Sequence, residues 1–162
     1  MDIKNLFYYD TEIGKIGIAE KDNKVTNVFF GDYVQKDPTN INETSIIKLA
    51  MLQIKEYLIG LRTSFNVPIN PVGTEFQLSV WEQLKKIPYG ETRSYKQIAQ
   101  CVGNIKACRA VGLANNRNPI AILIPCHRVI GANGKLVGYA GGLNIKKSLL
   151  NLESNYYKKF LF

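Results

Sequence analysis

Residues that bind metals or form disulfide bonds are scarce in this chain. It holds one histidine and three cysteines among 162 residues, and no two cysteines form a C-x-x-C pair. An odd and low number of cysteines argues against a disulfide framework, and a structural zinc site needs more thiol and imidazole ligands than the chain can supply. The glycine-rich signatures of nucleotide-binding loops are also missing. We therefore expect neither a metal nor another cofactor.

Long apolar runs are missing as well. No stretch approaches the roughly 20 apolar residues that a membrane span needs, and charged residues interrupt the first thirty positions, where a secretory signal would carry its apolar core. The chain is 46% hydrophobic and 21% charged, a balance typical of globular proteins. We expect a cytoplasmic protein of one large or two small domains with no membrane partner.

Acidic residues are rare in the second half of the chain. Positions 68–162 carry 13 Lys and Arg against 4 Asp and Glu, whereas positions 1–67 carry 8 against 9. A half-chain this basic suits a polyanion, because phosphate contacts release counterions and are the general source of nucleic-acid affinity. The alternative is a basic face that is merely solvated.

The two halves also differ in pattern. Short segments rich in aromatic and β-branched residues between Leu6 and Gly31 alternate with turn signals, which predicts an antiparallel meander. Apolar residues at three- and four-residue intervals over 44–59, ahead of Gly60, predict an amphipathic helix. Two prolines and a glycine follow in 68–73. They predict a linker that separates an N-terminal domain, 1–67, from a C-terminal domain, 74–162.

Past the linker the pattern is helical. Thr74–Gln77 and Ser94–Gln97 are capping boxes, each of which opens a helix. A third helix is expected over 105–114 after a turn at Gly103, and two helices joined by a short glycine-containing turn on a basic background predict a helix-turn-helix that binds DNA.

The third helix carries alanines where a sequence reader would carry donors and acceptors. Ala107, Ala110 and Ala114 accompany a single Arg109, and alanine cannot match the hydrogen-bonding edges of the bases. Small side chains favour close approach to a groove and sequence-tolerant binding. The alternative is an ordinary helix whose alanines allow close packing.

A thiol and the only histidine stand side by side at Cys126 and His127, after the apolar run Ala121–Ile124. The run predicts a strand that ends at Pro125. An imidazole that takes the thiol proton, directly or through one water, makes a cysteine a strong nucleophile. Neighbouring side chains on a strand point to opposite faces, so the pair needs a bridging water or a turn begun by the proline.

Two other interpretations of this segment stay open. Cys126 could be a buried small hydrophobe and His127 an ordinary core side chain. If the imidazole has a carboxylate partner, Glu153 on a last amphipathic helix and Glu91 are both candidates. Between the cysteine and that helix, Gly131–Lys135 is expected to turn a hairpin whose second strand begins at Leu136.

Two strings of residues resemble a known family. Asn118–Val129 reads N-P-I-A-I-L-I-P-C-H-R-V, and Gly138–Gly142 reads G-Y-A-G-G ahead of the helix that reaches Glu153. Together with Ser94-Tyr95 and Arg109–Gly112, they closely resemble the methylated-DNA–protein-cysteine methyltransferases, or O6-alkylguanine-DNA alkyltransferases. The resemblance is strong from the linker to Glu153 and holds only in outline before it.

The resemblance implies an α+β fold, with a ribonuclease-H-like N-terminal sheet and helix and a C-terminal winged helix-turn-helix domain that carries the active site. It implies a DNA repair protein that acts as a monomer. Such a protein binds double-stranded DNA through the minor groove with little sequence specificity and flips O6-methylguanine out of the duplex. The alkyl group then passes irreversibly to the protein's own cysteine.

Residue roles follow from the same resemblance. Cys126 would accept the alkyl group, His127 would deprotonate it through a water, and Glu153 would orient the imidazole. Asn118 would tie the DNA-binding helix to the segment that holds the cysteine. Many relatives have a serine at position 140, where this chain has Ala140, and the substitution leaves a slightly roomier pocket.

The remaining roles concern DNA and the flipped base. Tyr95 would crowd the phosphate and rotate the nucleotide outward, and Arg109 would fill the vacated place in the stack. Further DNA contacts are expected at Ala107, Ala110, Gly112, Arg117 and Arg128. The pocket for the base is expected to include Val129, Tyr139, Ala140 and Gly141.

Two rival functions remain at this point. One is a winged-helix protein that binds DNA or recognises lesions without transferring the alkyl group. The other is a cysteine hydrolase, which would need an oxyanion hole and no basic half-chain.

Overall fold

The computed structural model describes residues 4–32 and 39–156, and it divides the chain into two compact units. The first unit holds the residues up to 72 together with 119–121, and the second holds 73–118 and the residues from 122 onward. Within the described ranges, no helix is long and apolar enough to cross a membrane.

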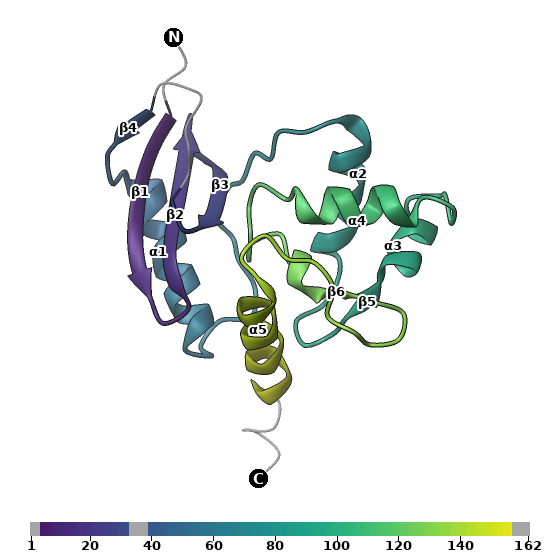
Figure 1. Cartoon of the computed structure of the whole chain (residues 1–162). Coiled ribbons are helices and arrows are strands. Elements are labelled where there is room, and N and C mark those ends of the chain that lie inside the picture. The colour runs from purple at the N-terminus through teal and green to yellow at the C-terminus, as the bar shows by residue number, and fades with distance from the viewer. Residues whose placement is uncertain (1–3, 33–38, 157–162) are drawn as a thin grey trace. The chain divides into compact units, whose positions relative to one another are not determined.

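The first unit contains a four-stranded sheet in the order β3-β2-β1-β4 (Figure 1). Its strands are β1 (Lys4–Thr11), β2 (Gly14–Lys21), β3 (Lys24–Phe30) and β4 (Thr39–Ile41). The first three form the predicted antiparallel meander. Asp22 and Asn23 both have positive φ at the β2–β3 turn, a conformation that these two residue types tolerate better than most. The short β4, which pairs parallel to β1, was not predicted.

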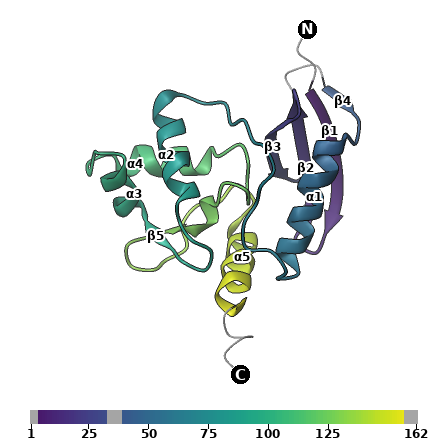
Figure 2. The same ribbon diagram turned by 180° about the vertical axis from the view of Figure 1, so that it is seen from behind.

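Helix α1 (Ser45–Leu58) confirms the amphipathic helix predicted over 44–59. It lies along one face of the sheet, as the two opposite views in Figures 1 and 2 show. Ile47, Ala50, Ile54 and Tyr57 are fully buried on its inner face. Gly60, with φ at 80°, follows the helix and provides the left-handed residue that often ends one.

The second unit is mainly helical, so the whole chain is α+β as predicted. Its helices are α2 (Glu75–Lys85), α3 (Tyr95–Cys101), α4 (Cys108–Asn116) and α5 (Leu143–Tyr156), with two-residue strands β5 (Arg93–Ser94) and β6 (Val129–Ile130). Both predicted capping boxes are present. The Thr74 and Ser94 hydroxyls accept from the backbone N–H of Gln77 and Gln97, and those glutamine side chains bond back to the cap residues.

Helix α4 begins later than predicted. The Asn104 side chain accepts from the Lys106 N–H at 3.0 Å, and the Asn104 carbonyl accepts from the Ala107 N–H at 3.0 Å, so this turn delays the helix to Cys108. Ile105, expected within the helix, therefore lies outside it and is 48% exposed. Ala114 is buried, and its carbonyl accepts from the Trp81 indole at 2.9 Å, so it is a packing residue.

The strands predicted around Cys126 are wrong. Ile122 and Leu123 form a turn, with φ of Ile122 at 71°, and the segment instead places Ile120 beside Val28 of β3. A single turn of 3-10 helix, η1 (Cys126–Arg128), follows Pro125. The Gly131–Lys135 turn exists, but no strand begins at Leu136, and β6 pairs parallel with β5.

Candidate active site

The cysteine and the histidine predicted as a pair both lie in η1 and are both buried. The Cys126 N–H donates to the Ile124 carbonyl at 2.8 Å, and the Arg128 N–H donates to the Pro125 carbonyl at 3.0 Å. Of the two arrangements that the sequence allowed, a bridging water or a turn begun by Pro125, the structure has the turn. Neighbouring side chains on a helical turn do not point to opposite faces, as they would on a strand.

Glu153 of α5 is the carboxylate partner of the histidine. Its Oε2 lies 2.6 Å from His127 Nε2, and both side chains are fully buried. The other candidate, Glu91, has a side chain that is 52% exposed and pairs with Arg93 at 3.3 Å. The helical spacing of Leu149 and Glu153 on the inner face of α5 explains why the carboxylate reaches the interior.

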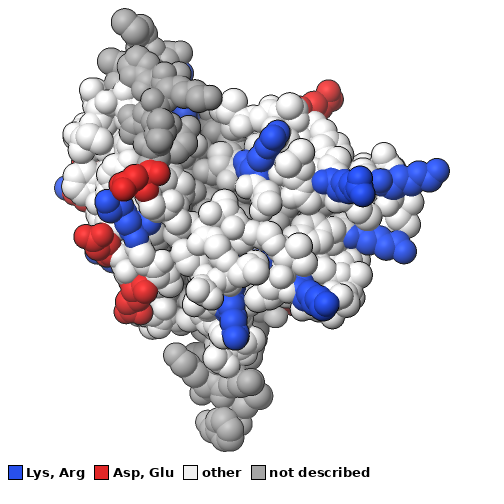
Figure 3. Space-filling view, viewed as in Figure 1, with Lys and Arg blue, Asp and Glu red and all other residues white. Residues whose placement is uncertain are grey.

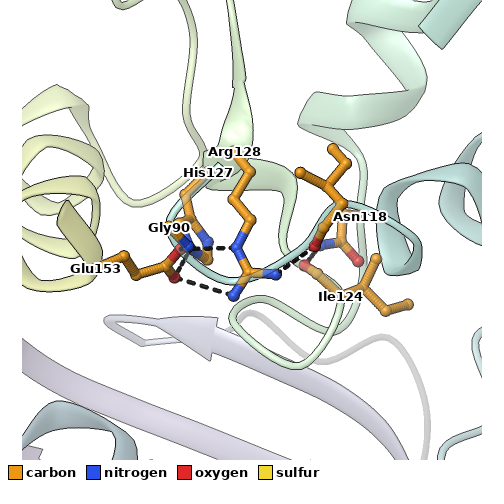
Figure 4. A network of polar contacts seen from close by, with 7 residues as sticks. Gly90, Asn118, Ile124, His127, Arg128 and Glu153 are labelled. Atoms are coloured by element: carbon orange, nitrogen blue, oxygen red, sulfur yellow. Dashed lines mark hydrogen bonds and ion pairs between the residues drawn. The ribbon is translucent and has the colours of Figure 1, made fainter. Parts of the chain in front are cut away.

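Arg128 and the backbone complete the set of donors around this carboxylate (Figure 4). Arg128 Nε donates to Glu153 Oε1 at 2.8 Å and Nη2 donates to Oε2 at 3.1 Å, while the Gly90 N–H donates to Oε1 at 3.1 Å. Burial alone would raise the pKa of Glu153, but its hydrogen bonds and its attraction to His127 and Arg128 outweigh burial and lower the pKa to about 2. Glu153 is a carboxylate at every physiological pH.

This fixed charge determines the histidine tautomer. A carboxylate can only accept, so His127 Nε2 carries the proton that it donates to Glu153, and Nδ1 of the neutral ring keeps the lone pair. Burial lowers the pKa of His127 despite the opposing effect of Glu153, so the ring is neutral near pH 7. The arrangement gives a base at Nδ1.

The thiol is held in its protonated form. Burial raises the pKa of Cys126 to about 11, although a hydrogen bond from the Asn118 side chain and the positive charge of Lys146 act in the opposite direction. Asn118 Nδ2 also donates to the Ile124 carbonyl at 2.8 Å, which ties the end of α4 to the turn before the cysteine. A thiol of this kind needs a base at the moment of attack.

Lys146 is a buried residue of this site that the sequence analysis missed. Its ammonium donates to three backbone carbonyls, those of Val129 at 2.6 Å, Val137 at 3.0 Å and Gly138 at 3.3 Å. Burial lowers its pKa, whereas the Cys126 thiol acts to raise it. Its spacing from Leu149, three residues on along α5, was the signal that placed it on the inner face.

Two tyrosines lie close enough to Cys126 for its charge to contribute to their raised pKa values. Tyr95, at the first position of α3, donates through its hydroxyl to the Val137 carbonyl at 2.8 Å. Tyr139 is buried, and burial raises its pKa, with smaller contributions from Cys126 and Glu153. Of the other positions expected in the pocket, Val129 is buried, Gly141 is half-buried and Ala140 is exposed.

Most of the positions expected to contact DNA lie at the surface. Arg109, Ala110 and Arg117 are exposed, and Ala107 and Gly112 are half-buried. The face of the second unit in Figure 3 carries several Lys and Arg side chains and little acid. Arg128 contradicts its prediction as a DNA contact, since it is 6% exposed and its guanidinium is held by Glu153 and by the Ile87 carbonyl.

Among residues 4–32 and 39–156, no three His, Cys, Asp or Glu side chains are grouped so that they could hold a metal ion. Cys126 and His127 are instead buried neighbours in η1, and the His127 ring is bonded to the Glu153 carboxylate. In this arrangement a base activates a nucleophile and a third group orients the base. It can support nucleophilic attack by the Cys126 sulfur.

Two family models match the chain. Residues 7–71 match the model described as 6-O-methylguanine DNA methyltransferase, ribonuclease-like domain, and residues 75–155 match the model of its DNA binding domain. The two matches agree with the predicted fold class, a ribonuclease-like sheet and helix followed by a DNA-binding domain.

Curated relatives and solved structures agree with these models. The chain is 52% identical to the methylated-DNA–protein-cysteine methyltransferase of Methanosarcina acetivorans, over 91% of this chain and 96% of that protein. It is 46% identical to the constitutive enzyme of Bacillus subtilis, over 93% and 95%. The crystal structure of Mycobacterium tuberculosis OGT in complex with DNA is similar to it, with a TM-score of 0.89, 43% identity and 94% coverage of both chains.

Proposed function

Because the chain belongs to the methylated-DNA–protein-cysteine methyltransferases, which transfer an alkyl group from DNA to a cysteine of their own, we propose that Cys126 is its acceptor. The observation that carries this assignment is the position of the buried Cys126 next to His127 in η1, with the His127 Nε2 atom 2.6 Å from the Glu153 carboxylate. The other two cysteines lack such a base. Cys101 is exposed on α3, and the Cys108 thiol donates to the Ile105 carbonyl at 3.4 Å.

The transfer is a displacement at the alkyl carbon. His127 Nδ1 takes the thiol proton, directly or through one water, while Glu153 stabilises the imidazolium that forms. The Cys126 sulfur then bonds to the alkyl carbon as the bond from that carbon to guanine O6 breaks. The proton that His127 took from the thiol passes to the departing guanine, so that the products are neutral guanine, a neutral imidazole and an alkylated, neutral cysteine. No oxidant or cofactor enters this balance, and the thioether makes the step irreversible.

The lesion reaches the thiol by leaving the duplex. We infer that α4 enters the minor groove of double-stranded DNA and that Arg109 occupies the place of the flipped nucleotide, with Tyr95 against its phosphate. Support comes from the exposure of Arg109 and Ala110 on α4, from the buried position of Cys126, and from the similarity to a relative solved with DNA. The few donors on this helix face favour binding with little sequence specificity.

Three further points concern the oligomeric state, the cellular location and the domain boundaries. We propose that the protein acts as a monomer, which agrees with a candidate site whose side chains all come from one chain. It acts in the cytoplasm, in keeping with three free cysteines. Domain boundaries at 67 and 74 stay a prediction.

The experiment is incubation with duplex DNA that contains O6-methylguanine, followed by intact mass measurement and peptide mapping. The protein should gain the mass of one methylene on Cys126. Cys126→Ser should gain nothing while keeping nearly all DNA affinity, because a hydroxyl is a far poorer nucleophile and the basic surface is untouched. Cys101→Ser and Cys108→Ser are matched controls that should react normally. A methylene mapped to Cys101 or Cys108 of the unmodified protein would refute the assignment. No mass gain at all would favour a protein that only recognises lesions.

A further inference from the structure

The mechanism above gives no role to the buried guanidinium of Arg128. We propose that Arg128 is a positioning residue for alkyl transfer: it holds Glu153 as an oriented carboxylate, so that His127 keeps its proton on Nε2 and its lone pair on Nδ1. The inference rests on the proposed function, in which His127 takes the proton of Cys126. It replaces the expected role of Arg128 as a DNA contact, which its burial contradicts.

The guanidinium is fixed at three sides. Its Nε and Nη2 form a two-bond fork on Glu153, at 2.8 and 3.1 Å, and its remaining arm, Nη1, donates to the Ile87 carbonyl at 2.7 Å. The guanidinium carbon also lies 5.6 Å from the centroid of the Tyr89 ring. A planar fork of this kind sets the orientation of a carboxylate as well as its charge, which a lysine ammonium cannot do.

The carboxylate of Glu153 has no acceptor capacity left over. Oε1 accepts from Arg128 Nε and from the Gly90 N–H, and Oε2 accepts from Arg128 Nη2 and from His127 Nε2. An ionised carboxyl offers about four acceptor positions, and here each oxygen has two donors (Figure 4). The bond to the histidine is therefore one of four that hold the carboxylate in a single plane.

Removal of Arg128 would take away two of these four donors and the nearest permanent positive charge. Burial favours the neutral form of a carboxyl group, so Glu153 would then tend to bind a proton. A protonated carboxyl donates to Nε2, and a neutral imidazole that accepts at Nε2 carries its own proton on Nδ1. Such a ring has no lone pair left for the thiol proton.

Three other titratable groups face the same network and are not altered by a substitution of Arg128. They are Cys126 on η1, Tyr139 on the loop before α5, and Lys146 on α5. Lys146 and Arg128 each act to lower the pKa of His127, and Glu153 acts to raise it. A change in the histidine tautomer in an Arg128 variant therefore reports on Arg128 and Glu153 and not on a change of these neighbours.

The chain offers a direct readout because His127 is its only histidine. Nitrogen NMR of the protein labelled at histidine distinguishes the two neutral tautomers with a single set of signals. We expect the Nε2–H form in the unmodified protein. Arg128→Met should populate the Nδ1–H form increasingly as the pH falls from 8 to 5, and Arg128→Lys, which keeps the charge but not the fork, should lie between the two. An unchanged tautomer in Arg128→Met would overturn the proposal.

The second test measures the rate of alkyl transfer in single turnovers on duplex DNA that contains O6-methylguanine. Arg128→Met should slow transfer at pH 7 by about tenfold or more, a share of what a general base contributes. When Glu153 is already replaced by Gln, adding Arg128→Met should slow transfer by less than about twofold relative to Glu153→Gln alone. The reason is that Arg128 then has no carboxylate to hold. Equal slowing in both backgrounds would place Arg128 in the fold instead.

Two controls keep the outcomes distinct. If Arg128→Met fails to fold, as thermal unfolding would show, the comparison uses Arg128→Lys alone and in the Glu153→Gln background, with the same expected loss of effect. Failure of the proposed function would show as no methylene on Cys126 of the unmodified protein, whereas the tautomer measurement needs no reaction at all.

Discussion

Cys126, the proposed alkyl acceptor, is kept by the fold in its protonated, unreactive form. Burial raises its pKa to about 11, so almost no thiolate exists at neutral pH, and the neutral His127 supplies the missing base. Glu153 holds the ring proton of His127 on Nε2, which leaves the lone pair of Nδ1 to accept the thiol proton. In the proposed mechanism the thiolate therefore forms only as the alkyl carbon is attacked.

The protonation states of His127 and Cys126 predict the pH dependence of the reaction. The neutral imidazole is the active form, so transfer by the unmodified protein should rise with pH through the lowered pKa of His127 and be level near neutral pH. His127→Ala should be slower by a factor of about a hundred or more at pH 7. Its rate should then rise about tenfold per pH unit toward the thiol pKa of about 11, because unaided thiolate formation becomes limiting.

Quenched reactions on methylated duplex DNA between pH 6 and 10 test this prediction. Glu91→Gln is the matched control, because that exposed carboxylate pairs with Arg93 and not with His127. A pH profile of His127→Ala that stays flat would mean that the ring serves the fold and not the proton transfer.

At the scale of elements, α5 carries the polar interior of the second unit. One face of this helix presents Lys146, Leu149 and Glu153, all buried, and the two charged side chains reach the loop at 137–138 and the turn η1. A helix with two buried charges is stable only because each has hydrogen-bond partners that replace water.

The anchoring of α5 predicts a loss of stability in acid. The folded-state pKa of Glu153, about 2, is below its ordinary value of 4.5, so its stabilising effect is complete above pH 4.5 and is lost as the pH falls toward 2. The free energy of unfolding should drop by roughly 3 kcal/mol over that window on account of this group. Urea unfolding at several pH values should show that Glu153→Gln lacks this part of the drop. Equal acid sensitivity of the two proteins would contradict the assignment.

Elements whose signals are local were predictable from the sequence. The capping boxes at Thr74 and Ser94 each fixed the start of a helix, because both partners lie within one turn. The start of α4 was missed because the Asn104 side chain closes a competing turn. The strand expected at 121–124 failed because an apolar run alone does not distinguish a strand from a buried turn.

The candidate site shows the same limit. Cys126 and His127 were adjacent in the sequence and therefore visible, and the choice between Glu153 and Glu91 was left open because it depends on which helix face is buried. Arg128 was taken for a DNA contact because a basic residue in a basic half-chain gives no local sign of burial. Only the fold, which brings Glu153 and Ile87 to it, shows the pairing.

At the scale of the whole molecule, the excess of basic over acidic residues lies in the second half of the sequence. Positions 68–162 hold 13 of the 21 Lys and Arg residues but 4 of the 13 acids. Contacts from such a surface to phosphates carry affinity without sequence information, and they weaken as salt replaces the released counterions. Binding of duplex DNA should therefore depend strongly on salt and little on sequence.

Arg109 allows affinity and base flipping to be separated. Flipping costs a few kcal/mol of stacking and pairing, which contacts made only after the base has left must offset. Arg109→Ala should therefore slow repair of duplex DNA far more than reaction with the free base O6-benzylguanine, which needs no flipping. Lys106→Ala is a matched control, since Lys106 is an exposed cation just ahead of α4 and should affect only the salt-dependent affinity. Equal slowing of Arg109→Ala on both substrates would assign that arginine to the pocket or the fold.

The burial of Cys126 also protects the thiol from oxidation and other side reactions before the protein meets a lesion. A protein that spends its nucleophile in one event must not lose it beforehand to peroxide or to other electrophiles, which attack thiolates in preference to thiols. With its side chain closed off from solvent and its pKa near 11, Cys126 is poorly suited to such encounters, whereas Cys101 lies exposed on α3. The desolvation that raises the thiol pKa makes a base necessary for the reaction. It also keeps the cysteine unmodified until the protein binds a lesion.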